Sequence, residues 1–418
     1  GNEVPPDYAD AWTVILYLNA EDSNFAPILT QYREDIESFI GGKSSFLNVV
    51  ILYDGPGTND TTRYLVQPNG NYTTGTNRWN VGELNMGDRD TLATFATWAM
   101  DQYPADHYYL SVDDHGNGAY GISWDPNSGN DQLTPPELYE ALKSATRNGQ
   151  RKIDIFDYEA CLMGLAENAY DLREWVNYVV FSEQISWGLD TYPRYFSDLA
   201  ATDTPLAVGQ RIVERYHAEA LVADGHGYPH TISLINTSKM ETVRNAVSSF
   251  GDTIRAANTP AQIKTARDAS QAFAADMAAT DYRRAEYIDL WDLANEAGAR
   301  GLAPTQAAAV KSAVTDAVVR ERHASGGASG YVWDHSGAHG LSIYYPPSES
   351  SSAFSSYVAP TIYQMSQDGT WDEFLNWALP SPDSRRGMSA NRATIKLLGG
   401  DAYADKYVYL PVVLRQRN

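Results

Sequence analysis

The 418-residue sequence contains a single cysteine, which excludes an internal disulfide and any zinc module built from several cysteines. Basic residues are scarce as well. The 31 lysines and arginines against 53 acidic residues give a formal net charge of −22, which opposes broad binding to nucleic acid or to an anionic membrane surface. No stretch approaches the roughly 20 apolar residues that a membrane-spanning helix needs. We therefore expect a globular protein that neither inserts into a membrane nor binds nucleic acid.

The remaining composition is typical of an exported protein. Tyrosine and glycine are abundant, and lysine is rare. We therefore expect a secreted or cell-envelope, extracytoplasmic location, and a monomer.

Short apolar runs alternate with segments of helical periodicity through the first half of the chain. This alternation predicts βαβ units and an α/β fold with a mostly parallel central sheet flanked by helices on both faces. The runs are nearly continuously apolar, as expected of strands that are covered on both faces. The predicted strands are residues 12–18, 47–53, 107–112, 153–157 and 178–182, with a shorter edge strand at 63–67.

The helices and the second half follow from the same reasoning. Thr134 and Glu137 form a capping-box pattern around Pro135, which predicts a helix start at that point. The second half is predicted to extend the same sheet with strands at 230–235 and 340–345. The predicted helices are residues 25–39, 135–146, one that begins at Cys161, 205–223, 239–257, 260–280 and 304–323.

No linker separates the two halves, so residues 8–380 are predicted to form one domain, with a core at 11–200 and an elaborated second half at 201–380. The segment 381–418 reads as a linker followed by a C-terminal strand or tail.

Two predicted strands end in reactive side chains. His115 follows the third strand, and Cys161 lies where the fourth strand meets the next predicted helix. The carboxyl ends of parallel strands share one edge of a sheet, so the imidazole and the thiol would face each other if the strands are neighbours. A helix N-terminus and a nearby imidazole both favour a thiolate. Gly116 would let a backbone N–H approach a developing oxyanion. The alternative is that Cys161, like many lone cysteines, is only a small buried residue.

Several motifs in order resemble the clostripain-like cysteine peptidases, which are relatives of caspases and gingipains. The resemblance covers roughly residues 11–345, and its most specific parts are DHGNG around His115 and FDYEACLMG around Cys161. It implies a caspase-like fold, a catalytic dyad of His115 and Cys161, and an oxyanion hole formed by the backbone of Gly116 and Cys161. The partner would then be a peptide or protein substrate.

The same resemblance implies cleavage after Arg or Lys, with an acidic group holding the basic side chain. Glu159 and Asp190 match the family's acidic positions, although the family usually has Asp where Glu159 stands. Ser182 and Trp187 would line the same pocket. Two alternatives stay open: a peptidase of altered, non-basic specificity, and a catalytically idle protein whose acidic groove captures peptides. A serine hydrolase is disfavoured because no Gly-x-Ser-x-Gly elbow is present.

No cofactor is expected, and calcium stays open as an alternative. Asp125, Asn127 and Asp131 alternate as in a calcium loop, but Asn130 and Pro136 occupy positions where such a loop needs Gly and Glu, so a plain acidic turn is favoured. Zinc is disfavoured at His217, Glu219, His226 and His230, because they lack the spacing of a zinc-binding helix, so ordinary surface histidines are favoured. His335 and His339 lie four residues apart in a glycine-rich loop and are expected to be structural.

Overall fold

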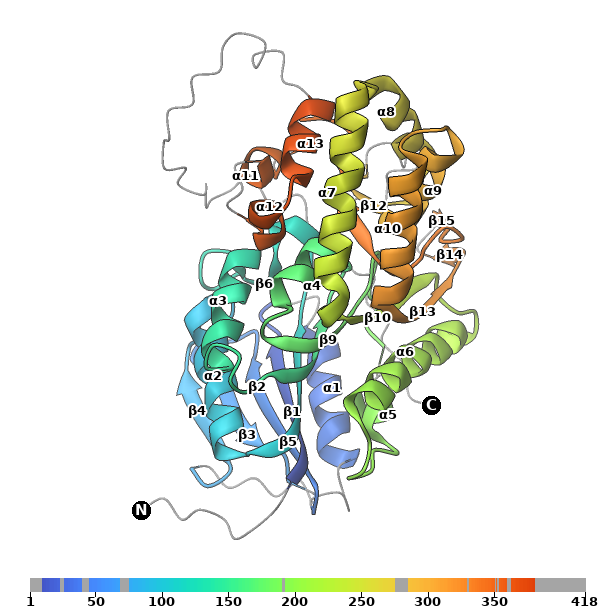
Figure 1. The fold of residues 1–418 in the computed structure, drawn as a ribbon. Coiled ribbons are helices and arrows are strands. Elements are labelled where there is room, and N and C mark those ends of the chain that lie inside the picture. The colour runs from blue at the N-terminus through green and yellow to red at the C-terminus, as the bar shows by residue number, and fades with distance from the viewer. Residues whose placement is uncertain are drawn as a thin grey trace.

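The computed structural model confirms the α/β class, with a central sheet between layers of helices (Figure 1). The predicted linker and C-terminal strand or tail at 381–418 lie outside the described residues. The structure describes residues 10–22, 26–39, 45–67, 75–189, 192–274, 285–328, 331–349, 351, 353–358 and 362–379.

The central sheet has nine strands in the order β13, β10, β9, β8, β5, β1, β2, β3, β4. The five strands from β9 to β2 are mutually parallel, and antiparallel strands extend the sheet at both edges. All six strands predicted for the first half belong to this sheet. Its strands are β1 (Asp10–Asn19), β2 (Leu47–Asp54), β3 (Thr61–Leu65), β4 (Arg78–Gly82), β5 (Ala105–Asp113), β8 (Ile153–Glu159), β9 (Val176–Phe181), β10 (His230–Asn236) and β13 (Val318–Ala324).

The strand order fixes the helix layers. The chain moves from β1 to β2 in one direction and from β5 through β8 to β9 in the other, so right-handed crossovers place the connecting helices on opposite faces. Helices α1, α5 and α6 pack together on one face, whereas α2, α3, α4 and α7 pack side by side on the other (Figure 1). Every residue from Ala11 to Ala20 is buried, as a central strand covered on both sides requires.

The helices confirm most of the predicted spans, and the capping box at Thr134 is present. Their bounds are α1 (Ala26–Phe39), α2 (Arg89–Gln102), α3 (Pro135–Ala145), α4 (Ala166–Leu172), α5 (Tyr192–Phe196), α6 (Pro205–Val222), α7 (Met240–Ala257), α8 (Pro260–Ala269), α9 (Leu290–Ala299), α10 (Pro304–Ala317), α11 (Phe354–Val358), α12 (Gln364–Asp368) and α13 (Trp371–Ala378), with short 3-10 turns at Gly118–Tyr120, Ala223–Gly225 and Thr237–Lys239. None of the described helices is long and apolar enough to cross a lipid bilayer.

Three predictions about the second half were wrong. The helix expected at 304–323 ends at Ala317, and the chain continues as the edge strand β13 against β10. The helix expected at 260–280 ends at Ala269, where β11 soon follows. The strand expected at 340–345 does not extend the main sheet, because β16 pairs with β12 in a separate sheet. The smaller sheets contain β6 (Ile122–Asp125), β7 (Asp131–Leu133), β11 (Ala272–Phe273), β12 (Tyr287–Asp289), β14 (Gly326–Ala328), β15 (Tyr331–Trp333) and β16 (Ser342–Tyr344).

The helix expected to begin at Cys161 also starts elsewhere. Cys161 lies in a turn, Leu162 adopts a left-handed backbone conformation with φ of 63°, and α4 begins only at Ala166. The turn is needed because residues 161–164 fold back against the end of β9, where the N–H of Gly164 donates to the carbonyl of Ser182 at 2.8 Å. A helix dipole therefore does not act directly on the sulfur.

Candidate active site

The histidine and cysteine segments leave neighbouring parallel strands. β5 pairs with β8 and places Asp113 opposite Glu159, so both chains emerge at the same edge of the sheet. The following residues pack tightly: a Cβ added to Gly116 would lie 2.6 Å from the carbonyl oxygen of Cys161 and 2.7 Å from Cβ of Ala160. Only glycine allows so close an approach. The residue after the histidine thus rests on the backbone of the cysteine.

His115 is held by acidic groups that the sequence did not single out. Its Nε2 lies 3.7 Å from Oδ2 of Asp22, which follows β1. Asp114 is buried and accepts a hydrogen bond from Nδ2 of Asn19 at 3.1 Å. Burial opposes a charged imidazole, but the carboxylates of Asp22 and Asp114 outweigh it and raise the pKa of His115 above its ordinary value. The site therefore stabilises an imidazolium.

Cys161 is a buried, neutral thiol in this structure. Its side chain is 1% exposed, and Sγ donates to the backbone carbonyl of Ser186 at 3.8 Å. Burial raises the pKa of the thiol to about 12, so the sulfur is protonated at neutral pH. Cys161 is therefore not a thiolate at rest, although the predicted helix N-terminus would have favoured one. A base must remove the proton as the sulfur reacts.

The backbone around Gly116 leaves its N–H directed away from its neighbour strand. Gly116 forms a bridge with Ile122, and the two hydrogen bonds of that bridge come from Asn117 N–H to Gly121 and from Ser123 N–H to His115. In such a pair the central N–H points outward. The N–H of Gly116 is thus geometrically suited to bind an anion outside the hairpin.

Glu159 lies beside the cysteine through a shared neighbour. The hydroxyl of Ser186 is 3.5 Å from Oε2 of Glu159, while the carbonyl of the same serine accepts from Cys161. The hydroxyl of Tyr195 donates to Oε1 of Glu159 at 2.8 Å. Burial raises the pKa of Glu159 to about 7, although both hydroxyls favour its charged form. An acid of readily altered charge therefore adjoins the thiol.

The other predicted pocket residues have structural contacts. Ser182 is buried and hydrogen-bonds to the hydroxyl of Thr231 at 2.9 Å, which ties the end of β9 to β10. Trp187 is buried, its indole N–H donates to the carbonyl of Pro229, and its ring stacks on Tyr228. Asp190 lies outside the described residues. The structure thus brings Glu159 near Cys161 and makes Ser182 and Trp187 parts of the surrounding framework.

A model of the Clostripain family (peptidase C11) matches residues 17–377. The chain therefore belongs to the clostripain family. Clostripain of Hathewaya histolytica is 25% identical over 313 residues, which cover 61% of this chain and 58% of that protein, so the match spans less than two thirds of that relative.

Solved members of the clostripain family share the fold. A secreted C11 cysteine protease from Bacteroides thetaiotaomicron, in complex with an irreversible peptide inhibitor, has a TM-score of 0.64 at 20% identity and covers 88% of this chain and 99% of its own. An inactive zymogen C11 protease from Parabacteroides distasonis has a TM-score of 0.61 at 19% identity with the same coverage.

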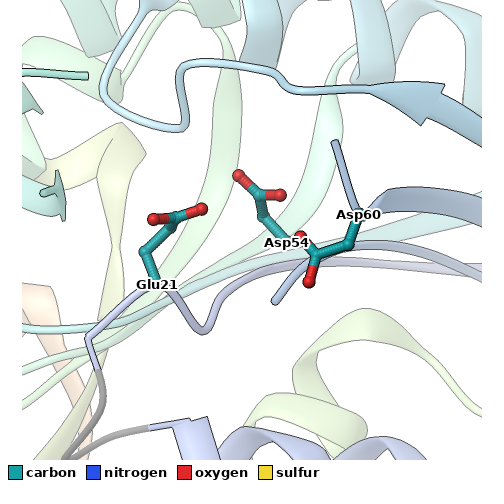
Figure 2. Close-up of side chains that lie close together, drawn as sticks. All are labelled: Glu21, Asp54 and Asp60. Atoms are coloured by element: carbon teal, nitrogen blue, oxygen red, sulfur yellow. The ribbon is translucent and has the colours of Figure 1, made fainter. Parts of the chain in front are cut away.

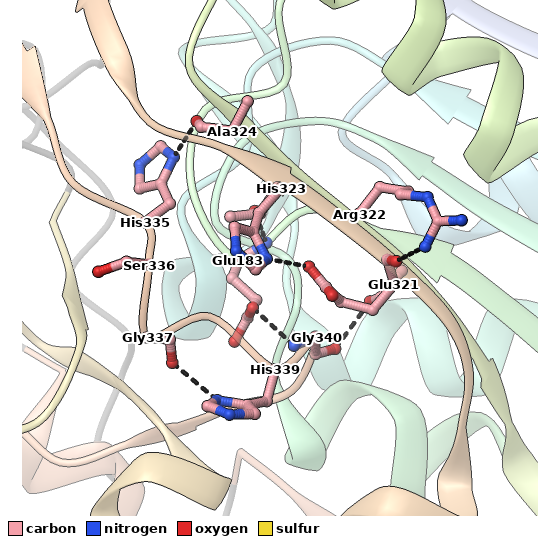
Figure 3. Close-up of polar contacts among 12 residues, drawn as sticks. Glu183, Glu321, Arg322, His323, Ala324, His335, Ser336, Gly337, His339 and Gly340 are labelled. Carbon is pink, nitrogen blue, oxygen red and sulfur yellow. Dashed lines mark hydrogen bonds and ion pairs between the residues drawn. The ribbon is translucent and has the colours of Figure 1, made fainter.

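In this chain, His335 and His339 hydrogen-bond to backbone carbonyls. Nδ1 of His335 is 3.1 Å from the carbonyl oxygen of Ala324, and Nδ1 of His339 is 2.8 Å from that of Gly337. Beside them, the carboxylate of Glu183 accepts from the N–H of Gly340 at 2.9 Å (Figure 3). Glu183 is the second residue after β9, so this network fastens the loop before β16 to the end of the strand that neighbours β8.

The weaker metal candidates from the sequence have internal partners. His217 and His230 hydrogen-bond to each other at 2.8 Å. At the acidic turn, Asp125 accepts from the backbone N–H of Met86 at 2.7 Å, and Asp131 accepts from an asparagine side chain. The expectation of ordinary surface histidines was wrong for His230, which is fully buried.

Sequence reasoning missed four residues of this clostripain-family site: Asp22, Asp114, Ser186 and Tyr195. Asp22 follows β1, the neighbour of β5, so the rule that strand ends converge would have found it. Ser186 and Tyr195 carry no such signal, because they lie in irregular chain and a short helix.

Proposed function

We propose that this chain is a secreted cysteine endopeptidase that cleaves peptide bonds after Arg or Lys through a dyad of His115 and Cys161. One observation carries the dyad: Gly116, next to the histidine, packs against the carbonyl of Cys161 at the shared edge of β5 and β8. Membership of the clostripain family supports the reaction class.

The geometry supports a mechanism in which His115 acts as a general base. The imidazole takes the thiol proton as Sγ of Cys161 bonds to the substrate carbonyl carbon, which suits a sulfur whose pKa is about 12. The N–H groups of Gly116 and Cys161 stabilise the resulting oxyanion. Asp22 and Asp114 stabilise the imidazolium, which then protonates the amine as the C–N bond breaks and leaves a thioester. Water, deprotonated by His115, hydrolyses the thioester to a free acid and restores the thiol.

Glu159 is the carboxylate that we assign to the basic side chain. Glu159 is 8% exposed, and both Glu159 and Cys161 contact Ser186. When a guanidinium lies beside Cys161, Glu159 exchanges its hydroxyl partners for this charged one. Asp190 stays a second candidate from the sequence. Ser182 and Trp187 shape the pocket wall through their contacts to β10 and Tyr228.

The extracytoplasmic location is supported by the Bacteroides thetaiotaomicron relative, which is described as secreted. We propose a peptide or protein substrate and action as a monomer, without nucleic acid.

The single cysteine permits a decisive test. A peptidyl chloromethyl ketone that carries Arg should add one label per chain, and mass spectrometry can assign it to Cys161 without ambiguity. Cys161→Ala should lose the label and lower kcat/KM for an Arg substrate at least about 1,000-fold while the chain stays folded by circular dichroism. His115→Ala should do the same, whereas the exposed His226→Ala serves as the matched control. Turnover by folded Cys161→Ala, or binding of basic peptides without cleavage by the unaltered chain, would refute the proposal.

A further inference from the structure

The turn that carries Cys161 is hydrogen-bonded to two neighbouring segments. On one side, the N–H of Gly164 donates to the carbonyl of Ser182, the first residue after β9, at 2.8 Å. On the other side, the carbonyl of Gly164 accepts from the N–H of Ser342, the first residue of β16, at 2.8 Å. The position of the sulfur therefore depends on how these two segments lie relative to each other.

The side chain of Glu183 joins the two segments. Glu183 is the next residue after Ser182. Its carboxyl group accepts from the hydroxyl of Ser342 at 2.8 Å and from the N–H of Gly340 at 2.9 Å. Figure 3 shows the contact with Gly340. Together with the hydrogen bonds of Gly164, these contacts form a closed ring around the turn.

Close packing leaves this ring little freedom. A Cβ added to Gly164 would lie 2.8 Å from the backbone N of Glu183, so only glycine allows this approach. The N–H of Glu183 donates to the hydroxyl of Thr231 in β10 at 3.0 Å. The hydroxyl of Ser233, also in β10, donates to the carbonyl of Gly340 at 2.7 Å. Both ends of the contact between Glu183 and Gly340 are thus anchored on one strand of the central sheet.

The acids that face Glu183 have imidazole partners of their own. From β12, Oδ1 of Asp289 lies 3.3 Å from Nδ1 of His339. From β13, Oε1 of Glu321 lies 2.6 Å from Nδ1 of His323. Glu183 is 1% exposed, and burial, followed by the charge of Asp289, raises its pKa well above the ordinary value. The surroundings thus favour the neutral form of Glu183, for which glutamine is the nearest isostere.

We propose that Glu183 is a positioning residue for the nucleophile, because its side chain holds β16 against the segment after β9 and so fixes the turn of Cys161. It acts through Gly164 and Ser342, whereas the basic side chain of the substrate is assigned to Glu159. The effect on turnover rests on the proposed dyad. A displacement of about 1 Å at a reacting group can lower the rate roughly 100-fold. Glu183 therefore affects catalysis without contacting the substrate.

Glu183→Ala removes both side-chain contacts and tests this role. Once circular dichroism shows that the variant is folded, kcat for an Arg peptide should be about 100-fold lower than that of the unaltered chain. KM should change less than about 3-fold, because Glu159 is unaltered. An unchanged kcat would overturn the proposal.

Hydrogen exchange measures the turn itself, whether or not the chain cleaves peptides. The amides of Leu162 and Gly164 donate to backbone carbonyls of residues 182–184. In Glu183→Ala, both amides should exchange more than about 10-fold faster. Faster exchange in a chain whose unaltered form cleaves no peptide would contradict the proposed function but support the positioning role. Unchanged exchange would contradict the positioning role.

Glu183→Gln separates positioning from a general loss of stability. Glutamine can accept from Gly340 and donate to the hydroxyl of Ser342, so kcat should stay within about 3-fold of that of the unaltered chain. Glu140→Gln, which removes an exposed acid from α3, is the control for the change of residue type. Asp171→Ala is the structural control, because this buried acid accepts two backbone N–H groups, at 3.0 and 3.1 Å, near the opposite end of α4 from the turn. It should lose stability and keep kcat.

Ser342→Ala tests the same contact if Glu183→Ala does not fold. It removes only the hydroxyl that donates to Glu183, so kcat should fall about 10-fold, and an unchanged kcat would overturn the proposal. Two results would show that Glu183 only stabilises the fold. One is a Glu183→Gln variant as slow as Glu183→Ala, and the other is an equal fall of kcat in Asp171→Ala.

Discussion

Replacing Glu159 with Gln tests how the chain recognises a basic side chain. Gln keeps the size of Glu159 and can still accept from Tyr195, so only the charge is removed. Removing one partner of a buried ion pair costs about 3–5 kcal/mol. Part of this free energy is already lost near neutral pH, because burial raises the pKa of Glu159 to about 7 and leaves the carboxyl partly protonated. We expect a loss of about 2–4 kcal/mol, or roughly 30- to 800-fold in kcat/KM for an Arg substrate.

The assay compares two fluorogenic peptides that differ only in arginine or its neutral isostere citrulline before the scissile bond. The unaltered chain should prefer arginine, and the preference should grow as the pH rises through about 7, because Glu159 becomes charged. Glu159→Gln should show little preference at any pH, and Glu140→Gln should behave as the unaltered chain. If Glu159→Gln keeps the full arginine preference, then Glu159 does not read the charge and Asp190 becomes the leading candidate.

Three further substitutions test the surrounding structure. Gly116→Ala places a Cβ 2.6 Å from the carbonyl oxygen of Cys161, so calorimetry should show about 1–3 kcal/mol of destabilisation. Turnover should fall more than about 10-fold. Normal activity would contradict the close packing. Tyr195→Phe removes a donor that favours the charged form of Glu159, so the arginine preference should develop at higher pH, and an unmoved profile would be a failure. Burial raises the pKa of the α4 residue Glu167 from 4.5 to about 7, so its protonation stabilises the fold below pH 4.5, and this contribution of up to about 3 kcal/mol is lost as the pH rises through 7. In urea unfolding, the free energy of unfolding of Glu167→Gln should therefore decrease less between pH 5 and 8 than that of the unaltered chain. An equal decrease would show that Glu167 does not cause this pH dependence.

The central sheet could be predicted because its strands are buried on both faces and are therefore continuously apolar. The edge strand β13 could not. Its sequence, VVRERHA, is only half-buried, and its charged residues continue the helical composition of α10. The strand β16 was found, but its sheet was not, because an apolar run does not specify which neighbour it pairs with.

The site could be predicted where a reactive side chain follows a predicted strand. His115 and Cys161 follow apolar runs, so their convergence at one edge could be anticipated. The prediction of a helix that begins at Cys161 was wrong because the apolar spacing continues through the turn. The backbone of residues 161–164 instead hydrogen-bonds to the residues that follow β9. Asp22 and Asp114 were overlooked although they follow the neighbouring strands β1 and β5, because single acids in loops are ordinarily solvated.

The parallel order β2, β1, β5, β8 also sets how far an acid at the end of β2 can act. Adjacent strands are about 4.8 Å apart, so three steps place the end of β2 about 14 Å from the end of β8. Two unit charges at that separation in water interact by only about 0.3 kcal/mol before ions weaken them further. Gain or loss of a proton at Asp54, the last residue of β2 (Figure 2), would thus have almost no effect on a peptide side chain bound at the end of β8. The acids that act on His115 are instead the nearby Asp22 and Asp114.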